Sequence, residues 1–305
     1  MIRLPEFLIL FSEVLLASYP ILIKSVPTNL WTQVVSRMLV YGGIAFSFLL
    51  QDKKQLGAVS ASTTAGAGLL NLLHVSTSYK AFADLPAGNA MAIFYAYPIW
   101  NLLGAHLFFG EEIPMKTVPW IVLAIIGMLM VAQPEVGTLF STDKPLATLC
   151  AVLSGVTESC IYFYFKAMGN QEGTFKGMFE LYGGSFFWML PVIMASQSGL
   201  ALPNLPNGLA LPKGLALPKG LALPKIDFQW KTWMPMLLFN IFVGFVGYAM
   251  RFSAIPMVST VIFSMLNFIG IVAAYAFGYV FQGENPTWMA MGGSAAILLA
   301  TSMII

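Results

Sequence analysis

Long apolar segments recur along almost the whole chain, and they restrict its fold more than any other feature. An apolar helix of about 20 residues is long enough to cross the hydrocarbon core of a bilayer. With 58% hydrophobic and 9% charged residues, the chain is far from the roughly 25% charged composition of soluble domains. We therefore predict an all-α integral membrane protein with ten transmembrane helices. The expected spans are residues 5–24, 29–50, 58–82, 86–109, 115–134, 145–168, 175–197, 231–252, 256–282 and 287–305.

Two parts of the chain, residues 81–132 and 254–305, share one design. Each contains a long apolar helix ending in Gly-Glu, then a proline turn, then a glycine-bearing apolar helix. The matching residues are Gly110, Glu111 and Pro114 in the first copy and Gly283, Glu284 and Pro286 in the second. Membrane transporters are often built from such repeats, with the substrate site between them. We predict two five-helix repeats, residues 1–140 and 141–305. The odd number of spans in each inverts one repeat relative to the other.

Paired glycines follow a tyrosine at corresponding places in the two halves. The segments are Tyr41-Gly42-Gly43 and Tyr182-Gly183-Gly184. Because glycine has no side chain, it lets two helix backbones approach closely. We expect both segments to lie at helix–helix contacts.

Residues 199–225 form a low-complexity segment in which the hexapeptide GLALPK occurs three times. Proline in every repeat excludes a regular helix, so we predict an irregular loop between two spans. Its lysines, Lys213, Lys219 and Lys225, either contact lipid headgroups or belong to a dispensable expansion.

Lysine and arginine in the loops predict the orientation in the membrane. With the repeat loop set aside, the N-terminal side carries Arg3, Lys53, Lys54, Lys116, Lys166, Lys176 and Arg251, and the other side carries Lys24, Lys80, Lys144 and Lys231. This difference favours cytoplasmic termini. We expect a multi-pass protein of the plasma membrane, with an organelle membrane as the alternative.

The Gly-Glu repeats resemble the EamA-type modules of the drug/metabolite transporter superfamily. The first copy has the matching residues Ala87, Ala90, Ala92, Pro98, Glu111 and Gly127, whereas Ile271 replaces the central proline in the second. The resemblance implies a ten-helix carrier with a central cavity, lined mainly by the first, third, fourth, sixth, eighth and ninth spans. Substrates of the family include amino acids, other metabolites, nucleotide sugars and phosphorylated sugars.

Two carboxylates, Glu13 and Glu158, fall in the middle of the first and sixth spans. Ionisable groups at membrane depth usually face a cavity or a partner. They either titrate or bind an amino group of the substrate, or else they are structural and pair with Arg37 or Lys166. His74 either responds to protonation, since imidazole titrates near neutral pH, or only bonds to a neighbour.

Polar and aromatic side chains lie on several spans in helical spacing. They bond across helices or line a wetted cavity, because such groups need partners in hydrocarbon. The predicted substrate-binding residues are Glu13, Asn71, His74, Tyr97, Trp100, Asn101, Glu158, Tyr162, Asn240, Tyr248 and Asn267. Lys80 and Arg251 are either an anion-binding pair or interfacial anchors. We expect no metal site, because the second histidine, His106, is isolated, and we expect no cofactor.

These features predict a secondary transporter that moves a small polar metabolite by alternating access. An amino acid or related zwitterion is the favoured substrate, with a proton or an exchange substrate as the coupling partner. The alternative carrier is a nucleotide-sugar or sugar-phosphate antiporter, and a non-transporting scaffold is the alternative of another class. We do not expect an enzyme or a nucleic-acid-binding protein. A monomer or homodimer in the lipid bilayer is expected.

Overall fold

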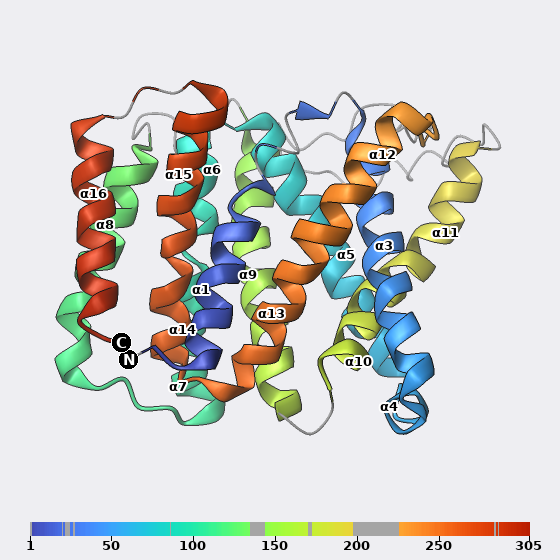
Figure 1. Cartoon of the computed structure of the whole chain (residues 1–305), viewed down its shortest axis with the longest axis horizontal. Helices are drawn as coiled ribbons and strands as arrows, with labels where there is room; N and C mark the ends of the chain where they lie inside the picture. Colours follow the sequence, from blue (N-terminus) through green and yellow to red (C-terminus); the bar gives the residue numbers. More distant parts are fainter. Residues whose placement is uncertain are drawn as a thin grey trace, which may run out of the picture.

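The computed structural model describes residues 2–19, 21, 25–26, 28–85, 87–134, 144–169, 173–197, 226–283, 285 and 287–305. The predicted loop at 199–225 and the predicted turn residues Glu284 and Pro286 lie outside these ranges. Helices and no strands occur in the described part, which confirms the all-α prediction. The fold is a bundle of helices that run between two faces of the molecule (Figure 1).

The first half contains α1 (Leu4–Leu16), α3 (Leu30–Gln51), α4 (Lys53–Gly57), α5 (Ala61–Asp84), α6 (Ala87–Phe94), α7 (Tyr97–Phe109), η1 (Met115–Thr117) and α8 (Val118–Ala132). The second half contains α9 (Pro145–Met168), α10 (Thr174–Met178), η3 (Phe179–Gly183), α11 (Gly184–Gln197), α12 (Trp230–Phe239), η4 (Asn240–Phe245), α13 (Val246–Ala254), η5 (Ile255–Met257), α14 (Thr260–Asn267), α15 (Ile269–Gln282) and α16 (Trp288–Ser302).

Six helical segments of the described chain are long and apolar enough to cross a membrane. They are Leu30–Gln51, Asn89–Phe109, Met115–Ala132, Pro145–Met168, Trp230–Met257 and Thr260–Phe281. α5 is as long as these segments, but its serine, threonine, asparagine and histidine residues make it more polar. The multi-pass membrane architecture is therefore supported, whereas ten spans and inverted repeats stay predictions.

Both chain termini lie at the same face of the bundle, which we call the terminal face (Figure 1). α8 packs against α16 at one edge, α5 against α9 in the centre, and α1 against α13. On the other side of the centre, α11 packs against α5 and α3. Helices from the two halves of the chain are thus interleaved in space.

Two of the predicted spans are interrupted near their middle. The span at 86–109 divides into α6 and α7 just before Pro98, because proline has no amide hydrogen and its ring clashes with the carbonyl four residues earlier. The span at 256–282 divides at Phe268, although Ile271 stands there instead of a proline. The second interruption was not predicted from the sequence.

Glycine residues bring helices from the two halves into close contact, as predicted. A Cβ atom on Gly42 would lie 2.9 Å from the backbone nitrogen of Gly183. The preceding tyrosines, Tyr41 and Tyr182, pack edge to face with ring centroids 4.7 Å apart. The two matching segments therefore contact each other.

The contact between Gly68 and Gly184 predicts different responses at two glycines of α5. A Cβ atom on Gly68 would lie 2.3 Å from the Gly184 backbone, while Gly66 has open space around it. Gly68→Ala is expected to lower the free energy of unfolding by about 1–3 kcal/mol through overpacking. Gly66→Ala is expected to be neutral or stabilising, because alanine is favoured over glycine within a helix. Denaturation of the two variants in detergent micelles measures the difference, and equal effects would contradict the packing argument.

Candidate functional site

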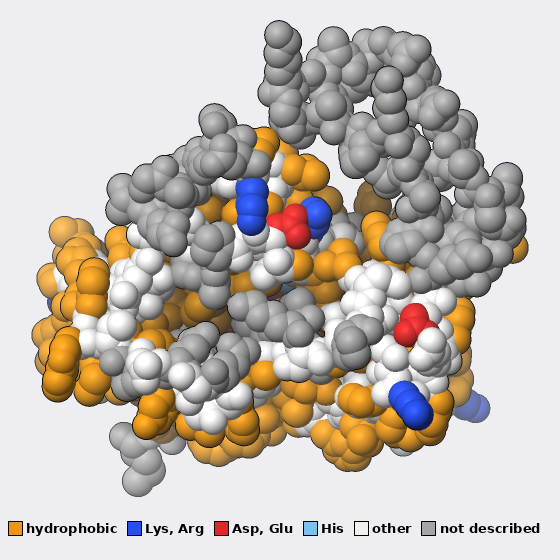
Figure 2. All heavy atoms as spheres, turned by 90° about the horizontal axis from the view of Figure 1, so that it is seen from above, with side chains coloured by type: hydrophobic (Ala, Val, Ile, Leu, Met, Phe, Trp, Pro, Cys, Tyr) orange, Lys and Arg blue, Asp and Glu red, His pale blue; other side chains and the backbone are white. Residues whose placement is uncertain are grey.

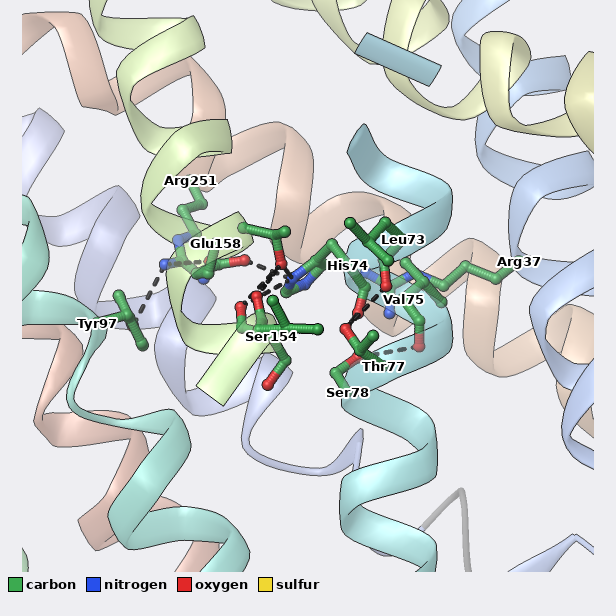
Figure 3. Close-up of polar contacts among 12 residues, drawn as sticks. Arg37, Leu73, His74, Val75, Thr77, Ser78, Tyr97, Ser154, Glu158 and Arg251 are labelled. Carbon is green, nitrogen blue, oxygen red and sulfur yellow. Dashed lines mark hydrogen bonds and ion pairs between the residues drawn. The ribbon is translucent and has the colours of Figure 1, made fainter. Parts of the chain in front are cut away.

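Three charged side chains from α1, α9 and α13 meet inside the bundle. Nη2 of Arg251 lies 2.7 Å from Oε1 of Glu158, and Nε of Arg251 lies 3.4 Å from Oε1 of Glu13. Figure 3 shows the contact with Glu158. All three residues are buried, with at most 5% of their surface exposed. Two carboxylates therefore share one guanidinium in a place where an unpaired charge is costly.

The two carboxylates of this cluster are held differently. Glu158 contacts both Arg251 and His74. In contrast, Oε1 of Glu13 and Nε of Arg251 have no hydrogen-bond partner among the described residues, although they lie at ion-pair distance. Gly270 makes room for the Glu13 carboxylate, since a Cβ atom there would lie 2.9 Å from its Oε2. Glu13 is therefore the loosely held member of the cluster.

His74 connects the cluster to α5 and has acceptor oxygens on both sides of its ring. Nε2 lies 3.2 Å from Oε2 of Glu158, while Nδ1 lies 3.2 Å from the carbonyl oxygen of Ser154 and 3.2 Å from Oγ1 of Thr157. A ring with a proton on each nitrogen donates to the carboxylate and to the carbonyl together. A neutral ring with its proton on Nε2 donates to Glu158 alone, because the Thr157 hydroxyl near Nδ1 donates to the carbonyl of Leu153. The geometry thus accommodates two proton states of His74.

A cavity extends from the charged cluster toward the face opposite the termini. Glu13, His74 and Arg251 line its inner end. Phe82 and Met91, near the ends of α5 and α6 at that face, line its outer part. Figure 2 views this face and shows a hollow near its centre. Among the described residues, the cavity therefore connects the cluster with the region near this face.

Contacts between α9 and the segment from α13 to α14 close the terminal face. The rings of Phe165 and Phe252 stack with centroids 4.0 Å apart. The Tyr162 and Thr260 hydroxyls lie 2.6 Å apart. Farther out, Nζ of Lys166 lies 2.9 Å from Oε1 of Glu111. In the described part of the chain, the cavity thus extends from the charged cluster away from the terminal face, and these contacts close the terminal side.

Arg37 of α3 occupies a separate part of the same cavity. Its guanidinium lies 4.8 Å from the ring centroid of Tyr19 and 4.7 Å from that of Tyr248, with Tyr41, Tyr79 and Tyr182 within 6 Å. Nη2 donates a 3.4 Å hydrogen bond to the Tyr182 hydroxyl. We call Arg37 and these five tyrosines the tyrosine cage.

The structure brings together five of the predicted site residues and a sixth contacts them. Glu13, His74, Tyr97, Tyr248 and Arg251 line the cavity, and Glu158 bonds to two of them. Tyr97 accepts a 3.3 Å hydrogen bond from Nη2 of Arg251. The predicted pairing of the two carboxylates with Arg37 or Lys166 was wrong, because their partner is Arg251. Arg37 lies in the tyrosine cage, and Lys166 pairs with Glu111.

Other predicted site residues lie away from the cavity lining. Asn71 donates to Ser185 at 2.9 Å, and Asn240 donates to Ser36 at 3.2 Å, so both bond across helices. Tyr162 lies in the closed layer. Trp100 is 46% exposed on the outer surface of the bundle. Its predicted role as a cavity wall is not supported by this placement.

Two predicted asparagines are buried without visible partners, and the predicted anion-binding pair is separated. The side-chain amides of Asn101 and Asn267 have no hydrogen-bond partner among the described residues. Lys80 pairs with Asp84 at 2.7 Å and is 43% exposed at the end of α5, whereas Arg251 is buried and paired with carboxylates. Lys80 and Arg251 therefore do not form one anion site.

Sequence reasoning missed the tyrosine cage and Tyr95. Arg37 was considered only as a partner for a carboxylate, although an arginine inside an apolar span is itself a signal of function. Tyr95 lines the cavity next to the helix interruption before Pro98. The tyrosines come from α3, α5, η3, α13 and the chain beyond α1, so their assembly follows from tertiary packing.

The fold and cavity define a multi-pass α-helical membrane protein with a buried polar site. Residues 3–133 match the model of the EamA-like transporter family. The predicted resemblance is confirmed. The match supports a membrane transporter of small metabolites.

Two curated relatives and a solved structure are similar over most of the chain. The relatives are pseudopaline exporters CntI from two strains of Pseudomonas aeruginosa, each 22% identical over 234 residues, which cover 76% of this chain and 71% of the relative. A crystal structure aligns with 99% of this chain and 97% of its own, with a TM-score of 0.70 and 15% identity. At that identity, the structural likeness supports the fold alone.

Removal of Arg251 should leave two buried carboxylates unpaired. Arg251→Met is expected to lower the free energy of unfolding by about 3–5 kcal/mol, as in other broken buried pairs. Lys80→Met, which breaks an exposed pair, is expected to cost less than about 1 kcal/mol. Denaturation in detergent at neutral pH compares the variants. Adding Glu158→Gln to Arg251→Met should recover part of the loss, and a strictly additive double variant would contradict the shared-charge arrangement.

The contact of Glu111 at the terminal face should depend on pH. Partial burial raises the pKa of the Glu111 carboxyl, but hydrogen bonds from Lys166 and Thr260 outweigh it and hold the pKa below its ordinary value. The contact therefore stabilises the fold above about pH 4.3, the ordinary glutamate pKa, and this stabilisation is lost as the pH falls through the lowered pKa.

Thermal unfolding in detergent as a function of pH measures this contribution. Glu111→Gln is expected to unfold at a lower temperature than the parent at pH 7, and the difference is expected to vanish in acid. Glu112→Gln is the matched control, because Glu112 is exposed on the same loop. A difference for Glu111→Gln that is constant across the pH range would contradict the ionic contact.

Proposed function

We propose that this protein is a secondary transporter that exports a small zwitterionic metabolite, an amino acid or a related compound, by alternating access. The carrying observation is Oε1 of Glu13, a buried oxygen of a cavity-lining residue with no hydrogen-bond partner among the described residues. A substrate ammonium group supplies the missing donors. The family match and the relatives named as exporters support transport and its direction.

The charge of the cluster supports exchange of the substrate for a proton. With His74 neutral, Glu13 and Glu158 carry one negative charge more than Arg251 balances. A second proton on His74 neutralises the cluster, and so does a substrate ammonium at Glu13. Because a low-dielectric site disfavours two added cations together, binding of the substrate is expected to displace the proton. The protein then couples export to proton entry.

The open and closed ends of the cavity support the transport cycle. In this conformation the cluster communicates with the face opposite the termini. Transport requires the closed layer between α9 and α14 to open while the far end closes. The two interrupted spans, at 95–96 and at Phe268, are positions where bending fits two inverted five-helix repeats. In this proposal the ten predicted spans form those repeats and the termini are cytoplasmic.

Two alternative functions are weighed against the lining of the cavity. A nucleotide-sugar or sugar-phosphate antiporter needs several free cations facing the cavity. In the described lining, Arg37 and Arg251 are the arginines, and Arg251 is already paired with carboxylates. A non-transporting scaffold leaves the cavity and its charged cluster without a role.

Transport assays in liposomes test the proposal. The uptake of each of the twenty common amino acids, radiolabelled, is compared with the uptake of a sugar phosphate and of a nucleotide sugar, with and without a pH gradient. Uptake of at least one amino acid should increase when the pH gradient drives protons across the membrane in the direction opposite to the amino acid.

Variants of the cluster separate binding from coupling. Glu13→Gln is expected to lose most of the uptake, because its amide has one acceptor and no charge for the ammonium group. His74→Gln is expected to keep exchange of labelled for unlabelled amino acid while losing the response to the pH gradient. Glu112→Gln should behave as the parent. Uptake of the phosphorylated probes alone would refute the zwitterion assignment.

A further inference from the structure

The guanidinium of Arg37 is a buried cation without an acidic partner in the described part of the chain. Arg37 is 2% exposed, and no described carboxylate lies within ion-pair distance of it. Its Nε has no hydrogen-bond partner there. The other buried arginine of the same cavity, Arg251, contacts two carboxylates. Arg37 is therefore the site where a negative charge is missing.

The tyrosine cage stabilises this cation without replacing an anion. Aromatic faces attract a guanidinium through their quadrupole and act above and below its plane. The N–H donors of arginine point outward within that plane, in a fork that fits a carboxylate with two parallel hydrogen bonds. The cage thus keeps Arg37 charged and oriented. Its Nη2 donates to the Tyr182 hydroxyl, whereas its Nε has no hydrogen-bond partner among the described residues and remains for a ligand. A site of this kind is suited to reversible binding of an anionic group.

Arg37 and the charged cluster present opposite charges to one cavity. Arg37, His74, Glu13 and Arg251 line one cavity. In the view of Figure 3, His74 lies between Glu158 on one side and Arg37 on the other. One end of the cavity therefore carries the loosely held Glu13 carboxylate, and another part carries an unpaired guanidinium.

We propose that Arg37 binds the carboxylate of the transported zwitterion, with the tyrosine cage holding its guanidinium in place. This inference rests on the proposed function, in which Glu13 binds the ammonium group. Together the two residues make the protein selective for compounds that carry both charges. Cations without a carboxylate and acids without an amino group are expected to bind weakly.

Thermal stabilisation of the purified protein in detergent by three matched ligands tests this inference. The probes are the amino acid that stabilises the parent most, its methyl ester, which lacks the carboxylate charge, and its deaminated acid, which lacks the ammonium group. Affinities are derived from the shift of the unfolding temperature with ligand concentration. The parent is expected to prefer the amino acid to its ester by about tenfold or more, since a charge-assisted pair is lost.

Substitutions of Arg37 and of Glu13 are expected to change different preferences. Arg37→Gln should reduce the preference for the amino acid over its ester to about onefold and leave binding of the ester unchanged. Glu13→Gln should reduce the preference over the deaminated acid and keep the preference over the ester. Arg3→Gln, which removes an arginine outside the cavity, should change neither. If Arg37→Gln does not fold, Arg37→Lys is expected to give an intermediate preference, because it keeps the charge and loses the fork.

The outcomes distinguish failure of this inference from failure of the proposed function. If an amino acid binds, Glu13→Gln weakens it, and the Arg37 variants keep the full preference over the ester, Arg37 does not bind the carboxylate and the proposed function stands. If no amino acid stabilises the parent, both fail. Binding of a sugar phosphate instead, lost in Arg37→Gln, overturns the carboxylate assignment and favours a phosphorylated substrate.

Discussion

The need to balance charge in a place without water governs the arrangement of this protein. Arg251 satisfies it by holding Glu158 at 2.7 Å and Glu13 at 3.4 Å, and in doing so it links α13 to α9 and α1. His74 of α5 joins this charged cluster through its contact with Glu158. Because each of these charges is costly alone, the four helices are coupled around the cavity. The cluster therefore joins helices from both halves of the chain.

Close helix packing positions Arg37, the second buried arginine of the cavity, among its tyrosines. Gly42 on Gly183 and Gly68 on Gly184 bring α3, α5 and the start of α11 together. The same contact sets Tyr41 against Tyr182, with Arg37 beside both rings. Small residues in a helix contact thus have an electrostatic consequence, since the aromatic faces they bring together stabilise a cation.

The membrane-protein class, the family and the close contact of the paired glycines could be derived from the sequence. Apolar length and low charge exclude a soluble fold, and the residues of the first Gly-Glu copy point to the family. The proline-induced interruption before Pro98 was also within reach, because its cause is local. The interruption at Phe268 was not, since no residue there forbids a helix.

The candidate site could be predicted only in part from the sequence. Glu13, Glu158 and His74 could be singled out, because an ionisable residue within an apolar span is recognisable from the sequence alone. Which cation pairs with them depends on helix packing, so Arg37 and Lys166 were wrong candidates and Arg251 was taken for an anion site or an anchor. The sequence by itself determined that buried charges exist and that a membrane surrounds them. The tertiary structure decided which charges neutralise each other and that Arg37 has no acidic partner among the described residues, because that depends on distances between helices far apart in the chain.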